Sequence, residues 1–109
     1  MKKLIITADD FGPVEGINNG IFKAIEEGKL TSVASFVNFQ NDQSIVNKAK
    51  VIFEKHNTEI GLHITLTSGI PVSNKMLIPN LVNPSGKFYS VKELPIRNIT
   101  KKEIKKQQK

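Results

Sequence analysis

Residues 3–12 read KLIITADDFG, an apolar run of β-favouring residues followed at once by two adjacent aspartates, Asp9 and Asp10. Such a run predicts a buried strand, and Gly12 with Pro13 predicts the turn that ends it. Two neighbouring carboxylates oppose each other's ionisation, and burial makes each charge more costly. The pair must therefore lie in water or be stabilised by a nearby positive charge, such as a bound cation.

Two more β-rich runs follow the first, TSVASFVNF at 31–39 and EIGLHITLT at 59–67. Each gap between consecutive runs holds apolar residues at helical spacing. They are Val14, Ile17, Ile21 and Ile25 in the first gap, and Ile45, Ala49, Ile52 and Phe53 in the second. Strand and helix alternate at about 28 residues per step, which predicts an α/β fold with a parallel sheet.

Boundary residues support both predicted helices. Pro13 lies near the start of the first helix, and Gly28 lies where a C-terminal cap belongs. Asp42 or Ser44 is the expected cap of the second helix. His56, near the end of that helix, is expected to be structural, because a partial positive charge there interacts favourably with the helix dipole.

The second half of the chain is less regular. Residues 68–90 contain three prolines and two glycines and predict a long loop, and residues 91–109 predict a basic helix. Residues 1–67 hold the strand–helix units. Three strands followed by such a helix look like the front of a larger fold, so we expect residues 1–109 to form a single incomplete domain.

The net charge of +6 is concentrated at one end of the chain. Residues 1–96 carry ten Lys and nine Asp or Glu, whereas residues 97–109 carry six Lys or Arg and one Glu. No aromatic residue lies among those lysines to stack on bases, so we expect no nucleic-acid partner. The absence of cysteine, of a secretory apolar segment and of a membrane span predicts a cytoplasmic protein with no membrane partner.

His63 is the second candidate for a functional site. In the run 59–67, Ile60, Leu62, Ile64 and Leu66 alternate with Gly61, His63, Thr65 and Thr67. The first set is predicted to pack against helices and the second to face inward. If the first and third strands are near neighbours, His63 approaches Asp9 and Asp10, because ligands bind at the carboxyl ends of parallel strands. Carboxylate and imidazole ligands suit Zn²⁺ or Mn²⁺, and Mg²⁺ less readily.

Each of these residues also has a purely structural interpretation. Adjacent aspartates often form a solvated turn or a helix cap, and a histidine on a strand is often a hydrogen-bonded interior residue. Phe88 and Tyr89 are candidates for stacking on a sugar ring, with core packing as the alternative. The DFG at 10–12 also occurs in protein kinases, but the catalytic loop and upstream lysine of kinases are missing here.

The order of motifs resembles the YdjC-like carbohydrate deacetylases over roughly residues 1–107. The motifs are TADDFG at 7–12, GINNGIFKAIEEGKLTSVASFVN at 16–38, EIGLHITLTSGIPV at 59–72 and PSGKF at 84–88. Members of that family are metal-dependent enzymes that remove acetyl groups from N-acetylated sugars such as chitooligosaccharides. The resemblance implies that this chain acts on the same class of N-acetylated sugar or oligosaccharide.

The same resemblance implies a distorted (β/α) barrel and a divalent ion, usually Mg²⁺ and in some relatives Zn²⁺. It assigns Asp9 as the general base, and Asp10 and His63 as metal ligands. Family members are roughly twice as long, in keeping with a barrel, and carry a further histidine-rich motif, whereas both histidines here precede residue 64. We therefore expect the N-terminal portion of the barrel, with little or no activity alone. Exposed strand edges would favour homo-oligomers.

Two alternatives belong to other functional classes. A receiver-like signalling domain also has paired acidic residues after its first strand, binds Mg²⁺ and is of similar length. It requires an aspartate at the end of its third strand, where this chain reads HITLTSG at 63–69. The other alternative is a non-catalytic remnant that folds poorly or only with a partner.

Overall fold

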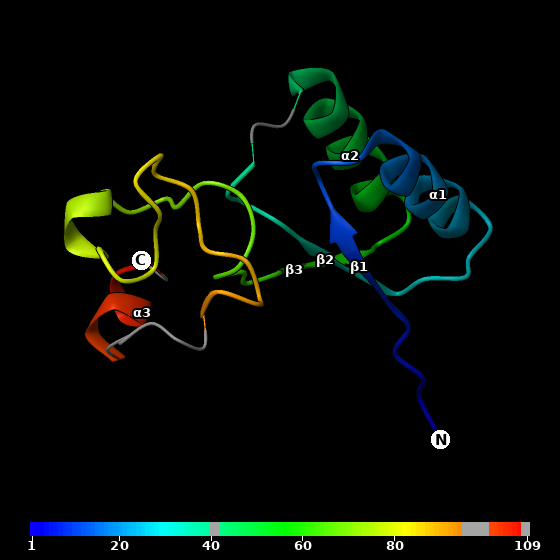
Figure 1. Cartoon of the computed structure of the whole chain (residues 1–109). Coiled ribbons are helices and arrows are strands. Elements are labelled where there is room, and N and C mark those ends of the chain that lie inside the picture. The colour runs from blue at the N-terminus through cyan, green and yellow to red at the C-terminus, as the bar shows by residue number, and fades with distance from the viewer. Residues whose placement is uncertain (40–41, 95–100, 108–109) are drawn as a thin grey trace. The chain divides into compact units, whose positions relative to one another are not determined.

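The computed structural model describes residues 1–39, 42–94 and 101–107 (Figure 1). The elements in chain order are β1 (Thr7–Phe11), α1 (Glu15–Glu26), β2 (Ser32–Ser35), α2 (Gln43–Lys55), β3 (Glu59–Leu62), the 3₁₀ helix η1 (Lys75–Leu77) and α3 (Lys101–Gln107). The chain divides into an N-terminal unit, Met1–His63, and a C-terminal unit, Ile64–Lys109. The N-terminal unit contains the whole sheet and both long helices.

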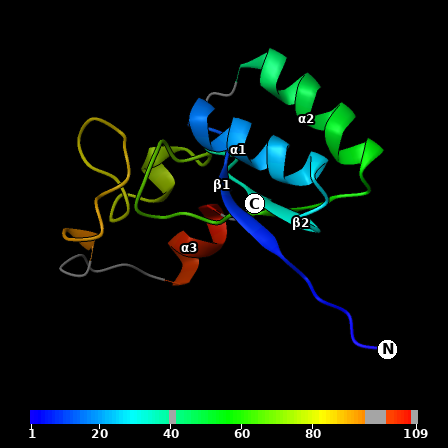
Figure 2. The same cartoon turned by 90° about the vertical axis from the view of Figure 1, so that its right-hand side faces the viewer.

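The strands of the N-terminal unit form one parallel sheet in the order β1-β2-β3. Both α1 and α2 lie on the same face of this sheet, as the two orthogonal views show (Figures 1 and 2). The predicted α/β class with parallel strands is therefore confirmed. A receiver-like doubly wound sheet has the order 2-1-3 at this point and helices on both faces, so the receiver alternative is wrong.

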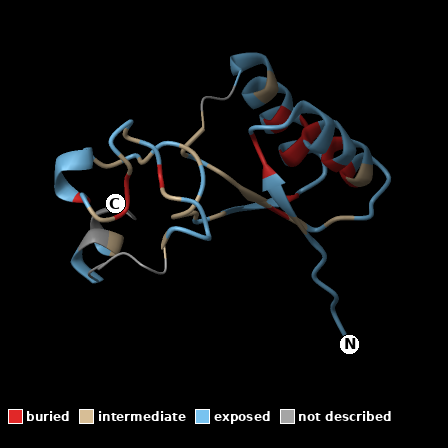
Figure 3. Cartoon of the chain, in the orientation of Figure 1, coloured by how far each residue is buried: buried red, intermediate tan, exposed pale blue. Residues whose placement is uncertain are grey.

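Eight buried apolar residues form the core of the N-terminal unit between the sheet and the two helices (Figure 3). They are Phe11, Ile21, Phe22, Ile25, Val33, Ala49, Ile52 and Phe53. Phe11 lies at the centre of an aromatic group, with its ring edge-on to Phe22 at 5.5 Å and to Phe53 at 5.4 Å between centroids. Because the core is built from β1, β2, α1 and α2, it fixes where the carboxyl end of β1 lies.

The two helices match the predicted patterns to different degrees. In α2 the predicted face is confirmed, and Asp42 is the cap, because its carboxylate accepts the backbone N–H of Ser44 at 2.8 Å. In α1 the predicted stripe is only half right, since Val14 and Ile17 are exposed. Asn18 and Phe22 are buried instead, so the buried face lies one residue further along the chain.

The strands are shorter than predicted. β1 begins at Thr7, where its pairing with Ser32 begins, and Leu4 and Ile5 are exposed. β3 ends at Leu62, and Ile60 and Leu62 were wrongly predicted to be packed, since they are 62% and 52% exposed. Among the described strands β3 is an edge strand, and neither α1 nor α2 covers it fully.

The C-terminal unit has a small core of its own within the predicted loop. Ile78, Leu81, Val82 and Phe88 are buried together, and an isolated antiparallel bridge pairs Val82 with Phe88. Of the predicted helix over 91–109, the structure describes α3, while residues 95–100 lie outside the described part. No described helix is both long and apolar enough to cross a membrane.

Candidate metal centre

A β-bulge at the end of β1 determines where the two aspartates lie. Ala8 pairs with Val33 and Phe11 with Ser35, so three steps along β1 match two steps along β2. Ala8 and Phe11 both pack into the core, which a regular strand would not allow for residues three apart. The extra residue therefore buries Phe11 while both aspartates stay out of the apolar core.

Asp10 adopts the conformation that the bulge requires. Its φ of 66° lies in the left-handed region, which few residues other than glycine occupy and which asparagine and aspartate tolerate best. Both Asp9 and Asp10 are exposed and belong to β1, whereas the apolar run predicted a strand that ends just before them. The predicted end of the strand was wrong by three residues, because strand pairing with β2 continues to Phe11.

His63 meets Asp10 across the end of the sheet. The backbone N–H of His63 donates to the carbonyl of Ser35 at 2.8 Å, which extends the β2–β3 pairing by one residue. Its Nδ1 lies 3.2 Å from Oδ1 of Asp10 and 3.3 Å from the backbone nitrogen of Asp10. The structure thus brings Asp10 and His63 together, although β2 separates their strands.

The imidazole Nδ1 lies close to two atoms of Asp10, the carboxylate Oδ1 and the backbone nitrogen. Nδ1 has one lone pair in the ring plane, so it either accepts the backbone N–H of Asp10 or, when it carries a proton, donates to Oδ1 of Asp10. An acceptor nitrogen 3.2 Å from a carboxylate oxygen makes no hydrogen bond unless a proton or cation lies between them. Two ligands about 2.1 Å from one ion, at angles of 90° to 110°, lie about 3.0–3.4 Å apart. The separation therefore fits either a shared divalent ion or, with Nδ1 protonated, a hydrogen bond from Nδ1–H to Oδ1.

Phe36 fixes the plane of the histidine ring. The two rings are stacked, with centroids 4.4 Å apart and an angle of 10° between their planes. Phe36 is itself edge-on to Phe39 at 5.3 Å, and its backbone N–H donates to the carbonyl of Phe11 at 3.0 Å. Phe36 was not predicted from the sequence, although its place just after the second strand was a usable signal.

Asn18 supports the turn after the bulge. Its Oδ1 accepts the backbone N–H of Gly12 at 2.8 Å, and its Nδ2 donates to the carbonyl of Gly12 at 2.9 Å. The side chain is only 1% exposed. Asn18 was not predicted from the sequence either, because an asparagine beside the apolar residues of a helix is typical of its solvated face.

The other predicted candidates lie elsewhere. His56 is the C-terminal cap residue of α2, as expected for a structural residue. Phe88 is buried in the C-terminal core, where it packs against apolar side chains, and Tyr89 is half-buried. Within the described part of the chain, no three His, Cys, Asp or Glu side chains converge on one point, so Asp10 and His63 are the two candidate ligands there.

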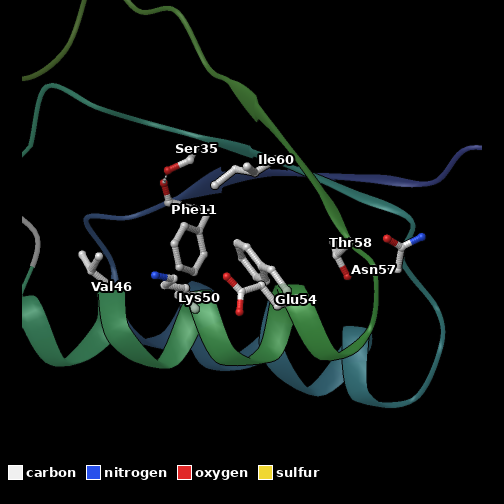
Figure 4. Close-up of a pocket in the computed structure, with 10 residues that line it drawn as sticks. Phe11, Ser35, Val46, Lys50, Glu54, Asn57, Thr58 and Ile60 are labelled. Carbon is white, nitrogen blue, oxygen red and sulfur yellow. Dashed lines mark hydrogen bonds between the residues drawn. The ribbon is translucent and has the colours of Figure 1, made fainter.

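A cleft of about 520 Å³ lies between the sheet and α2 (Figure 4). Its lining is mostly apolar and includes Phe11, Val46, Phe53 and Ile60. In the figure, the ring of Phe11 points from the sheet toward the helix. None of the three predicted site residues lines this cleft, so it is separate from the candidate metal centre.

Fold and site together define a parallel α/β protein with a carboxylate–imidazole pair at the carboxyl ends of its strands. Residues 3–109 match the YdjC-like protein family, and the chain belongs to that family. This confirms the resemblance seen in the sequence motifs.

Several curated relatives are named carbohydrate deacetylase. The one from Brevibacillus brevis is 41% identical over 86 residues, which cover 79% of this chain and 33% of the relative. The one from Halalkalibacterium halodurans is 39% identical over 87 residues, which cover 79% of this chain and 34% of the relative. This chain therefore spans about a third of the length of these relatives.

A solved structure from Enterococcus faecalis V583, described as a candidate cellobiose-phosphate cleavage protein, has a similar fold. The TM-score is 0.83 at 26% identity, over 98% of this chain and 41% of the other. The fold of this chain thus corresponds to less than half of that protein.

Proposed function

We propose that this chain is the N-terminal, metal-binding part of a carbohydrate deacetylase, which hydrolyses the acetamide group of N-acetylated sugars of the chitooligosaccharide type. Membership of the YdjC-like family and the name shared by the relatives support the reaction class. The observation that carries the proposal is the 3.2 Å approach of Nδ1 of His63 to Oδ1 of Asp10.

Asp10 and His63 would hold the divalent ion. By family resemblance Mg²⁺ is the usual ion, whereas one carboxylate and one imidazole suit Mn²⁺ or Zn²⁺ better. When bound, such an ion polarises the acetamide carbonyl and makes water a stronger acid. The stack with Phe36 orients the imidazole before any ion binds. That orientation lowers the cost of ordering the site.

Asp9 would act as the general base. It directly precedes Asp10 in β1, stays out of the core and is exposed, so water can reach its carboxylate. A carboxylate in this place can take a proton from the attacking water. The departing amine must then be protonated, and none of the residues assigned here takes that role.

The sheet supports a barrel as the complete fold. Strand order β1-β2-β3 with both helices on one face is the arrangement found in the wall of a (β/α) barrel. In such barrels the reacting groups lie at the carboxyl ends of the strands. Asp9, Asp10 and His63 occupy this end of β1 and β3.

The test uses a chimera in which residues 1–109 of this chain replace the matching N-terminal part of the Brevibacillus brevis relative. Acetate release from N,N′-diacetylchitobiose measures its activity. We expect the chimera to be active and Asp9→Asn to lower kcat by about 10²-fold to 10⁴-fold. Asp42→Asn is the matched control, since Asp42 caps α2 and should leave kcat unchanged. Full activity of Asp9→Asn and Asp10→Asn in this chimera would contradict the proposal. The isolated chain should release little or no acetate.

A further inference from the structure

We propose that Asn18 is a positioning residue for the metal centre: its side chain fixes the peptide groups of Gly12 and so holds the bulge that presents Asp10 to His63. Where it concerns the metal, this inference rests on the proposed function. Where it concerns the bulge, it rests only on the contacts of Asn18 with Gly12 and the backbone of Asp10.

The chemistry of this contact requires an amide. Asn18 lies in the first turns of α1, faces the core and is almost fully buried. A buried amide is costly unless both its donor and its acceptor are satisfied. Here both atoms bond to one residue, because Oδ1 accepts from the nitrogen of Gly12 and Nδ2 donates to its carbonyl. An aspartate offers the acceptor alone, and an alanine offers neither.

The backbone between Asp10 and Gly12 needs such a restraint. Asp10 has a φ of 66°, and Gly12 has a φ of 136° that residues with a side chain rarely adopt. Unfavourable backbone conformations persist only where the surroundings impose them. Phe11, between the two, is fixed by the core, and Gly12 is fixed by Asn18. With the second restraint removed, the strand can return to regular pairing, which turns Asp10 away from His63.

This role differs from a general contribution to stability. Any buried residue of α1 stabilises the unit, and its loss lowers the melting temperature without moving Asp10. Ile25 is a matched control, because it lies in the same helix and core and is equally buried, at 1% exposed. The decisive quantity is therefore the local geometry of Asp10 and His63 in variants that are still folded.

The first measurement uses the metal-free 109-residue chain and proton NMR. In the wild type and in Ile25→Ala we expect a nuclear Overhauser contact between the Asp10 β-protons and the His63 ring, with slow exchange of the Gly12 amide. In Asn18→Ala we expect both to be lost. If Asn18→Ala does not fold, Asn18→Asp decides, because it keeps the acceptor for the Gly12 N–H and loses the donor. It should retain slow Gly12 exchange and lose the Asp10–His63 contact.

Three results would overturn the proposal. They are a missing Asp10–His63 contact in the wild type, an unchanged contact in folded Asn18→Ala or Asn18→Asp, and an equal loss of the contact in Ile25→Ala.

The second measurement follows Mn²⁺ binding through the relaxation of water protons. Asn18→Ala should bind Mn²⁺ about 10-fold to 100-fold more weakly than the wild type, as found for residues that orient metal ligands. Ile25→Ala should differ by less than about 2-fold when both are folded. If the wild-type chain binds no Mn²⁺, the proposed function fails. The metal-free contact then still decides whether Asn18 positions Asp10. Equal weakening in both variants would contradict the role of Asn18.

Discussion

Phe11 joins the core of the N-terminal unit to the candidate metal centre, so replacing it with leucine tests how that unit is built. The ring of Phe11 lies edge-on to Phe22 at 5.5 Å and to Phe53 at 5.4 Å. Leucine keeps most of the apolar volume but loses both ring–ring contacts. Each such aromatic pair contributes about 0.5–1.5 kcal/mol beyond burial, so Phe11→Leu should lower the free energy of unfolding by about 1–3 kcal/mol.

This loss is large for so small a unit. At about 0.05–0.15 kcal/mol per residue, a unit the size of Met1–His63 has a stability of about 3–9 kcal/mol. Urea unfolding followed by far-ultraviolet circular dichroism measures the change for Phe11→Leu, Phe53→Leu and the double variant. The double variant should show a coupling of about 0.5–1.5 kcal/mol between the two rings. A Phe11→Leu variant as stable as the wild type, or strictly additive single changes, would refute this account of the core.

Three further predictions concern the turn, the cap and the ring stack. Gly12→Ala should destabilise the chain by about 1–3 kcal/mol in urea unfolding, because Gly12 has a φ of 136°. Gly16→Ala, a helical site where a Cβ meets no atom within 4 Å, should instead be neutral or stabilising, and the opposite order would contradict the assigned backbone. Hydrogen bonds from the backbone N–H and the hydroxyl of Ser44 lower the pKa of Asp42 below its ordinary 3.8. The ionised Asp42 therefore stabilises the fold fully above pH 3.8, and this stabilisation is lost as the pH falls through the lowered pKa. The melting temperature of the wild type should therefore fall more steeply than that of Asp42→Asn below about pH 4, and parallel curves would count against the cap. Phe36→Leu should weaken Mn²⁺ binding about 10-fold by loosening the His63 ring, while Phe36→Tyr should retain it; equal affinities for Leu and wild type would argue against the stack.

The sequence predicted the parts of the fold that depend on regular periodicity. The α2 face, the parallel strands and the approach of His63 to Asp10 all follow from spacings of 3.6 and 2 residues. Asp10 shows why the local geometry did not follow. A bulge inserts one residue, which reverses the side-chain alternation for the rest of the strand and cannot be seen in an apolar pattern.

The supporting residues were missed for a related reason. The role of Asn18 is evident only from its hydrogen bonds to the Gly12 peptide groups. The role of Phe36 is evident only from its stack on the ring of His63, 27 positions later in the chain. Both contacts depend on tertiary structure, and the only sign in the sequence is the place of Phe36 just after the second strand. The identity of the metal, the oligomeric state and the cytoplasmic location remain predictions.

The most direct test of the central claim is the effect of Mn²⁺ on the two histidine signals of the metal-free chain. The chain has only His56 and His63, so the ring protons of each can be assigned with one variant, His56→Gln. A site formed by Asp10 and His63 predicts that small amounts of Mn²⁺ broaden the His63 signals first, and that Asp10→Asn removes this selectivity. Equal broadening of both histidines, or unchanged selectivity in Asp10→Asn, would contradict the metal centre.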